Sequence, residues 1–260
     1  AEVFLPPHFR FFLRFPKIQQ NTVDKLNEAL PGLTEFMIAR TAYFDELFLN
    51  ALKNNIPQIV LLGAGYDTRA SRFMDAIQET RIYELDISPT QERKKTLLKK
   101  AKVEFPTELH FVPIDFNRDS LLDTLQRAGW ESSEKTFFIW EGVSYYLEED
   151  SVASTLDFVS QQAAPGSTLA LDYTLSLTDD NIGNYYGAAD FKRTMAEHHA
   201  NEALLFLMPE GSLSGYLEQH GLSMVEHLDQ AEIEHKYLTD DRGSLIGPMT
   251  GHFRFVLASS

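Results

Sequence analysis

Short apolar runs alternate with longer amphipathic stretches along most of the 260-residue chain. The short runs are rich in β-branched and aromatic residues, as in strands, whereas the longer stretches repeat apolar residues at helical spacing. The predicted strands are Gln58–Gly63, Arg81–Asp86, Leu109–Pro113, Thr136–Trp140, Thr168–Tyr173, Leu222–Leu228 and His252–Ala258. The predicted helices are about Thr34–Asn54, Thr68–Ile77, Pro89–Val103, Ser120–Ala128 and Glu149–Ala163. Because strands that alternate with helices need crossover connections, we expect a doubly wound α/β fold with a mostly parallel sheet.

Two segments fall outside this alternation. Residues 1–33 are rich in phenylalanine and proline, and residues 174–215 form a long insertion after the fifth predicted strand. Long insertions in compact domains are commonly lids or binding loops. We therefore expect a single domain, with an N-terminal extension that covers the site and an insertion on the substrate side. The alternative is that these segments are surface helices that only pack.

A glycine turn follows the first predicted strand. Gly63 and Gly65 let the backbone bend sharply and let a ligand approach where a Cβ would collide. A nicotinamide-binding turn would need a third glycine where Thr68 stands, and Asp67 places a carboxylate where a diphosphate would sit. The turn therefore suits a ligand without phosphates, such as a nucleoside that carries an amino acid.

An acidic residue ends the second predicted strand. Asp86 lies 21 residues after Gly65, where such folds place a carboxylate on the hydroxyls of a ribose. Glu84 lies two residues earlier, on the same face of the strand, and is the alternative for this role.

Further polar residues follow the third and fourth predicted strands. Asp115 could accept a hydrogen bond from an adenine amino group, and Phe116 could pack on its ring. Glu141 follows the fourth strand directly. Because open α/β sheets bind ligands at the carboxyl ends of their strands, we expect these residues to gather around one site.

Four motifs together resemble the leucine carboxyl methyltransferase family. They are Gly63-Ala-Gly-Tyr-Asp67-Thr-Arg69, Tyr83-Glu-Leu-Asp86, Asp115-Phe116 and Trp140-Glu141-Gly142-Val-Ser-Tyr-Tyr146-Leu. The family includes enzymes that methylate the C-terminal leucine carboxylate of a protein and the tetracenomycin-type polyketide O-methyltransferases. The resemblance covers residues 34–173 well and continues more weakly to the last strand. It implies a Rossmann-like class I methyltransferase fold with seven strands, the last of them antiparallel, and S-adenosylmethionine as cofactor.

The resemblance also implies roles for individual residues. Arg40 matches the arginine that holds the carboxylate of the methionine moiety, and a guanidinium can pair with a carboxylate through two hydrogen bonds. The remaining assignments are Gly63 and Gly65 to the methionine part, Asp86 to the ribose, Asp115 and Phe116 to the adenine, and Glu141 to the amino group and sulfonium. The family's N-terminal lysine contact could be made by Lys17, Lys25 or Arg14.

The methyl acceptor determines which catalytic groups are needed. A carboxylate is ionised at neutral pH and requires no base, whereas a phenol or alcohol benefits from one. The candidates for a base are His198 and His199 in the insertion, and Tyr173 at the end of the fifth strand is the first candidate for contact with the reacting acceptor. Aromatic residues near the expected mouth are the substrate candidates, namely Tyr145, Tyr146, Tyr185, Tyr186 and Phe191.

Composition narrows the classes of function. A formal net charge of −15 opposes nucleic-acid binding, which needs a basic surface. The chain has no cysteine for thiolate zinc sites, and we expect no bound metal. We also expect no membrane span and, without an export signal, a cytoplasmic location. The sequence thus predicts an O-methyltransferase for a small molecule; the alternatives are a protein carboxyl methyltransferase, a nicotinamide-dependent oxidoreductase and a non-catalytic cofactor-binding protein.

Overall fold

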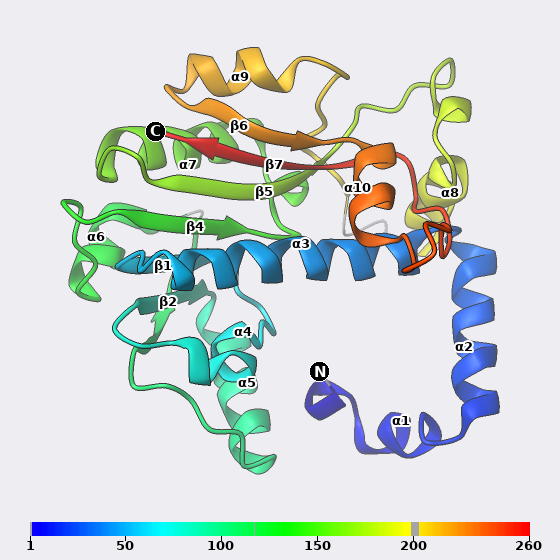
Figure 1. The fold of residues 1–260 in the computed structure, drawn as a ribbon, viewed down its shortest axis with the longest axis horizontal. Helices are drawn as coiled ribbons and strands as arrows, with labels where there is room; N and C mark the ends of the chain where they lie inside the picture. Colours follow the sequence, from blue (N-terminus) through cyan, green and yellow to red (C-terminus); the bar gives the residue numbers. More distant parts are fainter. Residues whose placement is uncertain (1, 117, 199–202) are drawn as a thin grey trace.

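A computed structural model describes residues 2–116, 118–198 and 203–260. Its strands form one seven-stranded sheet in the order β3-β2-β1-β4-β5-β7-β6 (Figure 1). The strands are β1 (Gln58–Leu62), β2 (Arg81–Asp86), β3 (Leu109–Pro113), β4 (Thr136–Trp140), β5 (Thr168–Thr174), β6 (Ser223–Leu228) and β7 (Phe253–Ser259). β1 to β5 pair in parallel, and β7 runs antiparallel to both β5 and β6. The predicted sheet and its antiparallel last strand are confirmed.

Helices cover both faces of the sheet, as a mostly parallel sheet requires. One face carries α3 (Leu33–Lys53), α4 (Arg69–Arg72), α5 (Ser88–Lys100) and α10 (Gln230–Tyr237). The other carries α6 (Leu121–Arg127), α7 (Glu149–Gln162) and α9 (Leu213–Gln219). Because β1 and β4 are covered on both sides, all of their residues are buried, which explains why they are apolar after their first residues, Gln58 and Thr136.

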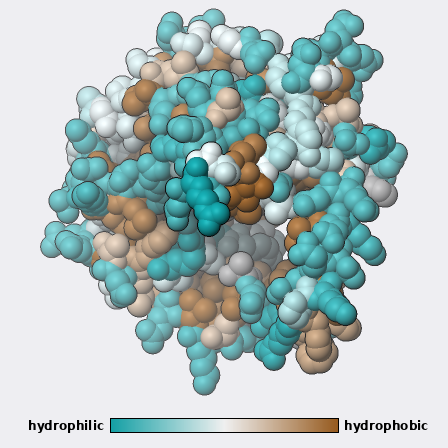
Figure 2. Space-filling view, turned by 45° about the vertical axis from the view of Figure 1, so that its right-hand side comes forward, coloured by the Kyte–Doolittle hydropathy of each residue, from teal (hydrophilic) through white to brown (hydrophobic). Residues whose placement is uncertain are grey.

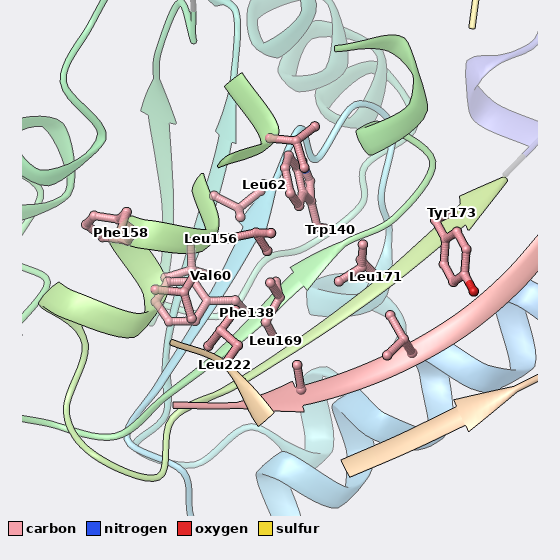
Figure 3. Close-up of a cluster of buried hydrophobic side chains, with 14 of the residues drawn as sticks. Val60, Leu62, Phe138, Trp140, Leu156, Phe158, Leu169, Leu171, Tyr173 and Leu222 are labelled. Carbon is pink, nitrogen blue, oxygen red and sulfur yellow. The ribbon is translucent and has the colours of Figure 1, made fainter. Parts of the chain in front are cut away.

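The core on the second face runs along the central strands. Val60, Phe138 and Leu169 from three adjacent strands pack against Leu156 of α7 (Figure 3). Tyr173 lies further along β5, on the same face as Leu171. Residue 172 therefore faces the opposite side, toward α3, because successive side chains of a strand alternate between faces.

One predicted helix is wrong in length. Instead of one helix over Thr68–Ile77, the chain forms the single turn α4 and then the 3₁₀ turn η2 (Met74–Ala76). The break falls at Phe73, whose ring packs against Phe48 of α3 with 6.0 Å between the ring centroids. Packing of this aromatic side chain thus overrides the local helical pattern.

The N-terminal residues form an arm beside the sheet. It consists of η1 (Glu2–Phe4), α1 (Pro7–Phe12) and α2 (Pro16–Ala29), and α2 contacts α3 at one end while η1 contacts α5 at the other (Figure 1). Phe4 packs on Tyr66 of the glycine turn, with 4.7 Å between centroids. Several apolar side chains of α1 and α2 are exposed, and Figure 2 shows hydrophobic patches among the hydrophilic side chains on one face of the molecule. That the arm acts as a lid remains a prediction.

The insertion after β5 contains η4 (Ile182–Asn184) and α8 (Ala188–His198). It returns to the sheet through a short bridge between Leu175 and Met208. The 3₁₀ turn η3 (Ser144–Tyr146) follows β4 and lies against the returning segment, since the amide of Leu205 donates a hydrogen bond to the carbonyl oxygen of Tyr145 at 2.8 Å. Within the described part of the chain, no helix combines the length and the apolar character needed to cross a bilayer.

Candidate functional site

The glycine turn lies at the carboxyl end of β1. Gly63 and Gly65 have φ angles of 71° and 46°, the left-handed region that glycine adopts without strain. A Cβ on Gly63 would lie 2.6 Å from Val143 Cγ2, so only glycine fits there. The amide of Gly65 donates a hydrogen bond of 2.6 Å to Asp86 Oδ2, and Asp86 Oδ1 accepts one from Ile87. The turn and the carboxylate predicted for the ribose are thus in direct contact.

A buried arginine links three other carboxylates beside this turn. Arg69 is 3% exposed and pairs through its Nη2 with Glu141 at 2.7 Å and through its Nε with Asp45 at 2.8 Å. It also pairs with Asp67. Because Arg69 compensates the charge of the Asp67 carboxylate, the sequence argument that Asp67 would repel a diphosphate is weaker than it appeared.

Arg40 lies on the other side of Glu141. Its Nη1 lies 3.4 Å from Asp172 Oδ2 and donates a hydrogen bond of 3.1 Å to the hydroxyl of Tyr145. Its Nε lies 3.1 Å from Glu141 Oε1 but makes no hydrogen bond to any described residue. A Cβ on Gly142 would lie 3.1 Å from Arg40 Nη1, so the guanidinium fits closely over this glycine.

These charged residues form what we call the rim cluster. Its members are Arg40, Asp45, Asp67, Arg69, Arg72, Glu141 and Asp172, with Arg72 joined through Asp45. Burial raises the pKa of Asp172 and of Glu141, although the neighbouring guanidinium groups oppose the shift. Burial also works to lower the pKa of Arg40 and Arg69, but the carboxylates around them outweigh it and raise both. Arg40 and Arg69 therefore stay charged, and their guanidinium groups favour the ionised forms of Glu141 and Asp172.

The rim cluster fits S-adenosylmethionine. The cluster contains four carboxylates and three guanidinium groups, so it favours a ligand with a net positive charge. The cofactor carries a sulfonium, an ammonium and one carboxylate, which gives it that net charge. Arg40 has an unsatisfied Nε to offer the carboxylate, and Asp86 lies where it could bind the ribose. When bound, the cofactor supplies a methyl group that is already activated, so the protein's task is to bind and orient.

The adenine candidates lie close to the strand end but are less buried. Asp115 pairs with Arg118, with 3.5 Å between Oδ2 and Nε, and its amide donates a hydrogen bond to Asp119. Phe116 is half-buried against the core. Both follow β3, on the Asp86 side of the sheet, and their roles remain predictions.

Glu84 does not lie at the rim. It is 2% exposed and pairs with Lys94 of α5, whose Nζ is 2.5 Å from Glu84 Oε2. Burial raises the pKa of Glu84 to about 7 against the attraction of the ammonium. Although Glu84 shares a face with Asp86, α5 covers it, and this alternative for the ribose is wrong.

The acceptor candidates outside the insertion do not lie together. Tyr145 is buried at Arg40, whereas Tyr146 is exposed. Tyr173 faces away from the rim cluster, and its hydroxyl lies 2.9 Å from His227 Nε2 of β6. The structure thus does not bring Tyr173 to Arg40, and its catalytic role remains an untested prediction.

The insertion residues are more scattered. Tyr185 donates a hydrogen bond to Glu210, Tyr186 is 48% exposed, and Phe191 of α8 is buried against His252. Of the two histidine candidates for a base, His198 ends α8 and its side chain lies outside the described residues; His199 lies outside them entirely. Neither can be placed relative to the rim cluster.

Sequence reasoning missed four members of the rim cluster, namely Asp45, Arg69, Arg72 and Asp172. Asp172 is the single carboxylate in the apolar run of β5, and this isolated charge was the signal for it. Arg69 belonged to the glycine-turn motif but was given no role. Asp45 lies on α3 and meets Arg69 only through folding, so no sequence pattern indicates it.

Fold and site together define a Rossmann-like methyltransferase. The model of the leucine carboxyl methyltransferase family matches residues 1–160, and the chain belongs to this family. It is an S-adenosylmethionine-dependent methyltransferase, and S-adenosylmethionine is its cofactor.

Individual relatives agree with the family. The chain is 30% identical over 238 residues, 90% of its length and 77% of the relative, to a Bacillus subtilis protein named "putative S-adenosyl-L-methionine-dependent methyltransferase YktD". It is 33% identical over 196 residues to a Mycobacterium tuberculosis protein with the same general name, covering 74% of the chain but only 63% of that relative. The crystal structure of a DUF574 family protein from Streptomyces avermitilis has a TM-score of 0.66, with 95% of this chain and 91% of that chain covered. At 16% identity this likeness shows the fold alone.

Proposed function

We propose that the protein transfers a methyl group from S-adenosylmethionine to an oxygen atom, a hydroxyl or a carboxylate, of a small molecule. The observation that carries the proposal is a cavity of about 200 Å³ between α8, the end of β5 and the segment before β7. A volume this size is below the ~300–1,000 Å³ of sites for drug-sized ligands, so it suits a small acceptor. The family's name supports an oxygen acceptor.

The chain's own residues would then bind and orient the two reactants. Arg40 would hold the carboxylate of the cofactor, Asp86 its ribose, and Glu141 its positively charged part. Positioning accounts for most of the catalysis when the donor is already activated, because it replaces a bimolecular encounter by a fixed geometry. We expect no nucleic-acid or membrane partner, in keeping with the net charge of −15, and a cytoplasmic location.

Transfer of a labelled methyl group tests this proposal. The protein is incubated with methyl-labelled S-adenosylmethionine and three panels: small hydroxyl compounds, small carboxylic acids and peptides ending in leucine. We expect label in one of the small-molecule panels, in a product whose methyl group mass spectrometry places on oxygen. Label in the peptides alone would indicate a protein carboxyl methyltransferase. Cofactor binding without transfer to any panel would favour a binding protein.

A further inference from the structure

The cavity beside α8 has a mostly apolar lining. Six of the nine described residues that line it are apolar, and they come from the end of β5, from α8 and from the returning segment: Leu175, Leu177, Phe191, Met195, Leu204 and Leu207. An apolar cavity of about 150 Å³ holds a benzene molecule. The cavity beside α8, with about 200 Å³, therefore has room for one substituted ring.

The cavity is open to a ligand from the surface. Leu207 is 39% exposed and the side chain of Lys192 is 52% exposed, and both residues line the cavity. The other two polar lining residues, Thr174 and His252, are buried. Because the ammonium of Lys192 lies 3.3 Å from Asp179 Oδ1, the only charged group of the described lining already has a partner. The surface that a ligand meets inside the cavity is therefore mainly hydrocarbon.

β5 connects the cavity to the rim cluster. Thr174, which lines the cavity, follows Asp172 by two residues, so the two side chains lie on the same face of the strand. Two residues of a strand span about 7 Å. Asp172 Oδ2 in turn lies 3.4 Å from Arg40 Nη1. The cavity thus begins within a few ångströms of the charged groups at the rim.

An aromatic chain makes the same connection. Arg40 Nη1 donates a hydrogen bond of 3.1 Å to the hydroxyl of Tyr145, and the ring of Tyr145 packs on Phe253 with 5.7 Å between centroids. Phe253 packs on Phe191 of the cavity lining at 5.6 Å. A molecule in the cavity therefore lies beside the expected methionine end of the cofactor, which carries the methyl group.

We propose that this cavity binds the methyl acceptor through an apolar body the size of one ring, from which the reacting oxygen extends toward the rim cluster. The inference rests on the proposed function and narrows it from small molecules in general to acceptors with such a body. The lining determines specificity because removal of an apolar ring from water stabilises the complex, whereas a wholly polar acceptor gains nothing from a hydrocarbon wall.

Met195 provides a reporter inside the cavity. The methyl carbons of methionine are labelled with ¹³C, and toluene is titrated into the intact protein without cofactor up to its solubility limit. We expect the resonance of Met195 to shift, because a bound ring lies against it, while that of Met224, which is exposed on β6, stays in place. Glycerol should shift neither resonance. An unmoved Met195 resonance, or an equal shift with glycerol, would overturn the proposal.

Two neighbouring leucines give a matched pair of variants. Leu204→Trp and Leu205→Trp add the same volume, but only Leu204 lines the cavity, whereas Leu205 is 48% exposed. Leu204→Trp should weaken toluene binding at least tenfold by filling the space, and Leu205→Trp should leave it unchanged. Equal affinities in the two variants would contradict the proposal. If Leu204→Trp does not fold, the Met195 resonance of the natural protein decides.

Paired acceptors test specificity during methyl transfer. Benzyl alcohol is compared with ethanol, and phenylacetate with acetate, so that each pair shares a reacting group and differs in the ring. In the pair that is methylated, we expect kcat/KM of the ring compound to be at least tenfold higher. If neither pair is methylated, the Met195 resonance decides.

Failure of the proposed function gives a different result. If labelled methyl groups reach only peptides or nitrogen acceptors, the proposed function is wrong, and the inference falls with it. If ethanol or acetate is methylated as well as its ring-bearing counterpart, the proposed function stands and only the inference about the ring fails.

Discussion

At the rim, seven acidic and basic side chains pair with one another, whereas six of the residues that line the cavity beside α8 are apolar, and Thr174, Lys192 and His252 complete its lining. Tyr145 and Phe253 connect the two regions. The rim cluster can hold a charged ligand because its own charges compensate one another and the ligand. Of the residues that line the cavity, Lys192 carries a charge, and its ammonium lies 3.3 Å from Asp179.

Loss of Arg69 should have the largest effect. Arg69→Met leaves Asp45, Asp67 and Glu141 without their shared partner in a buried place, which should lower the free energy of unfolding by about 3–5 kcal/mol. Chemical denaturation measures this. The matched control is Arg81→Met. Arg81 pairs with exposed Glu131 and partly buried Glu134, and its loss should cost at most about 1 kcal/mol. Equal losses would show that the rim is no more than a surface network.

Asp86→Ala should weaken cofactor binding at least tenfold. A carboxylate that binds two ribose hydroxyls makes charge-assisted hydrogen bonds, each worth about 1.5–3 kcal/mol. Because methylthioadenosine retains the ribose, calorimetry should show similar losses for it and for S-adenosylmethionine. Asp86→Asn keeps the size of the side chain and serves as the control for the glycine turn. If Asp86→Ala binds the cofactor as tightly as the natural protein does, the assignment of Asp86 to the ribose is wrong.

The neutral state of His252 predicts a pH dependence of stability. Its pKa is lowered on folding from about 6.5 to about 3, so between these values the unfolded chain binds a proton that the folded protein does not. Stability should therefore fall as the pH decreases through this window, by roughly 2 kcal/mol between pH 7 and pH 5. Denaturation of His252→Phe at the same pH values provides the reference. Parallel curves for the two proteins would mean that His252 does not remain neutral.

Arg40→Ala should act on one part of the cofactor only. S-adenosylmethionine should bind roughly tenfold more weakly, because a guanidinium–carboxylate pair is lost, whereas methylthioadenosine, which lacks that carboxylate, should change little. Since Asp172 would be left unpaired, Arg40→Ala with Asp172→Asn is the control for an uncompensated buried charge. Equal losses for both ligands would rule out the assignment of Arg40.

Tyr173→Phe should have the smallest effect. It removes one hydrogen bond, to His227, and should cost about 1 kcal/mol of stability without reducing methyl transfer. This outcome would limit the acceptor site to the Arg40 side of β5. A large loss of transfer with unchanged stability would instead restore the catalytic role predicted for Tyr173.

The central strands could be predicted because burial on both faces makes most of their residues apolar, as the run from Phe137 to Trp140 in β4 illustrates. Short helices were harder. α10 has little apolar periodicity and begins with a capping box between Asp229 and Glu232, a signal present in the sequence but overlooked. The contact of Arg69 with Glu141 joins residues far apart in the chain, so it follows from strand order and not from spacing.

The acceptor side was the least predictable part. His252 was predicted as the first residue of the last strand, yet β7 begins at Phe253, and His252 is fully buried just before it. Its Nδ1 lies 3.1 Å from the hydroxyl oxygen of Thr250, whereas its Nε2 has no hydrogen-bond partner among the described residues. Which ring nitrogen has a partner depends on the three-dimensional packing and cannot be predicted from the sequence.

The position of β7 between β5 and β6 also has a consequence for biosynthesis. During translation β6 leaves the ribosome before β7, and in the finished sheet β7 is its neighbour. β6 therefore has no strand to pair with until more than twenty further residues have been added, and α9 must shield it in the meantime or leave an edge open to aggregation. A nascent chain halted between Leu228 and Phe253 should accordingly be a preferred client of chaperones that bind exposed strands.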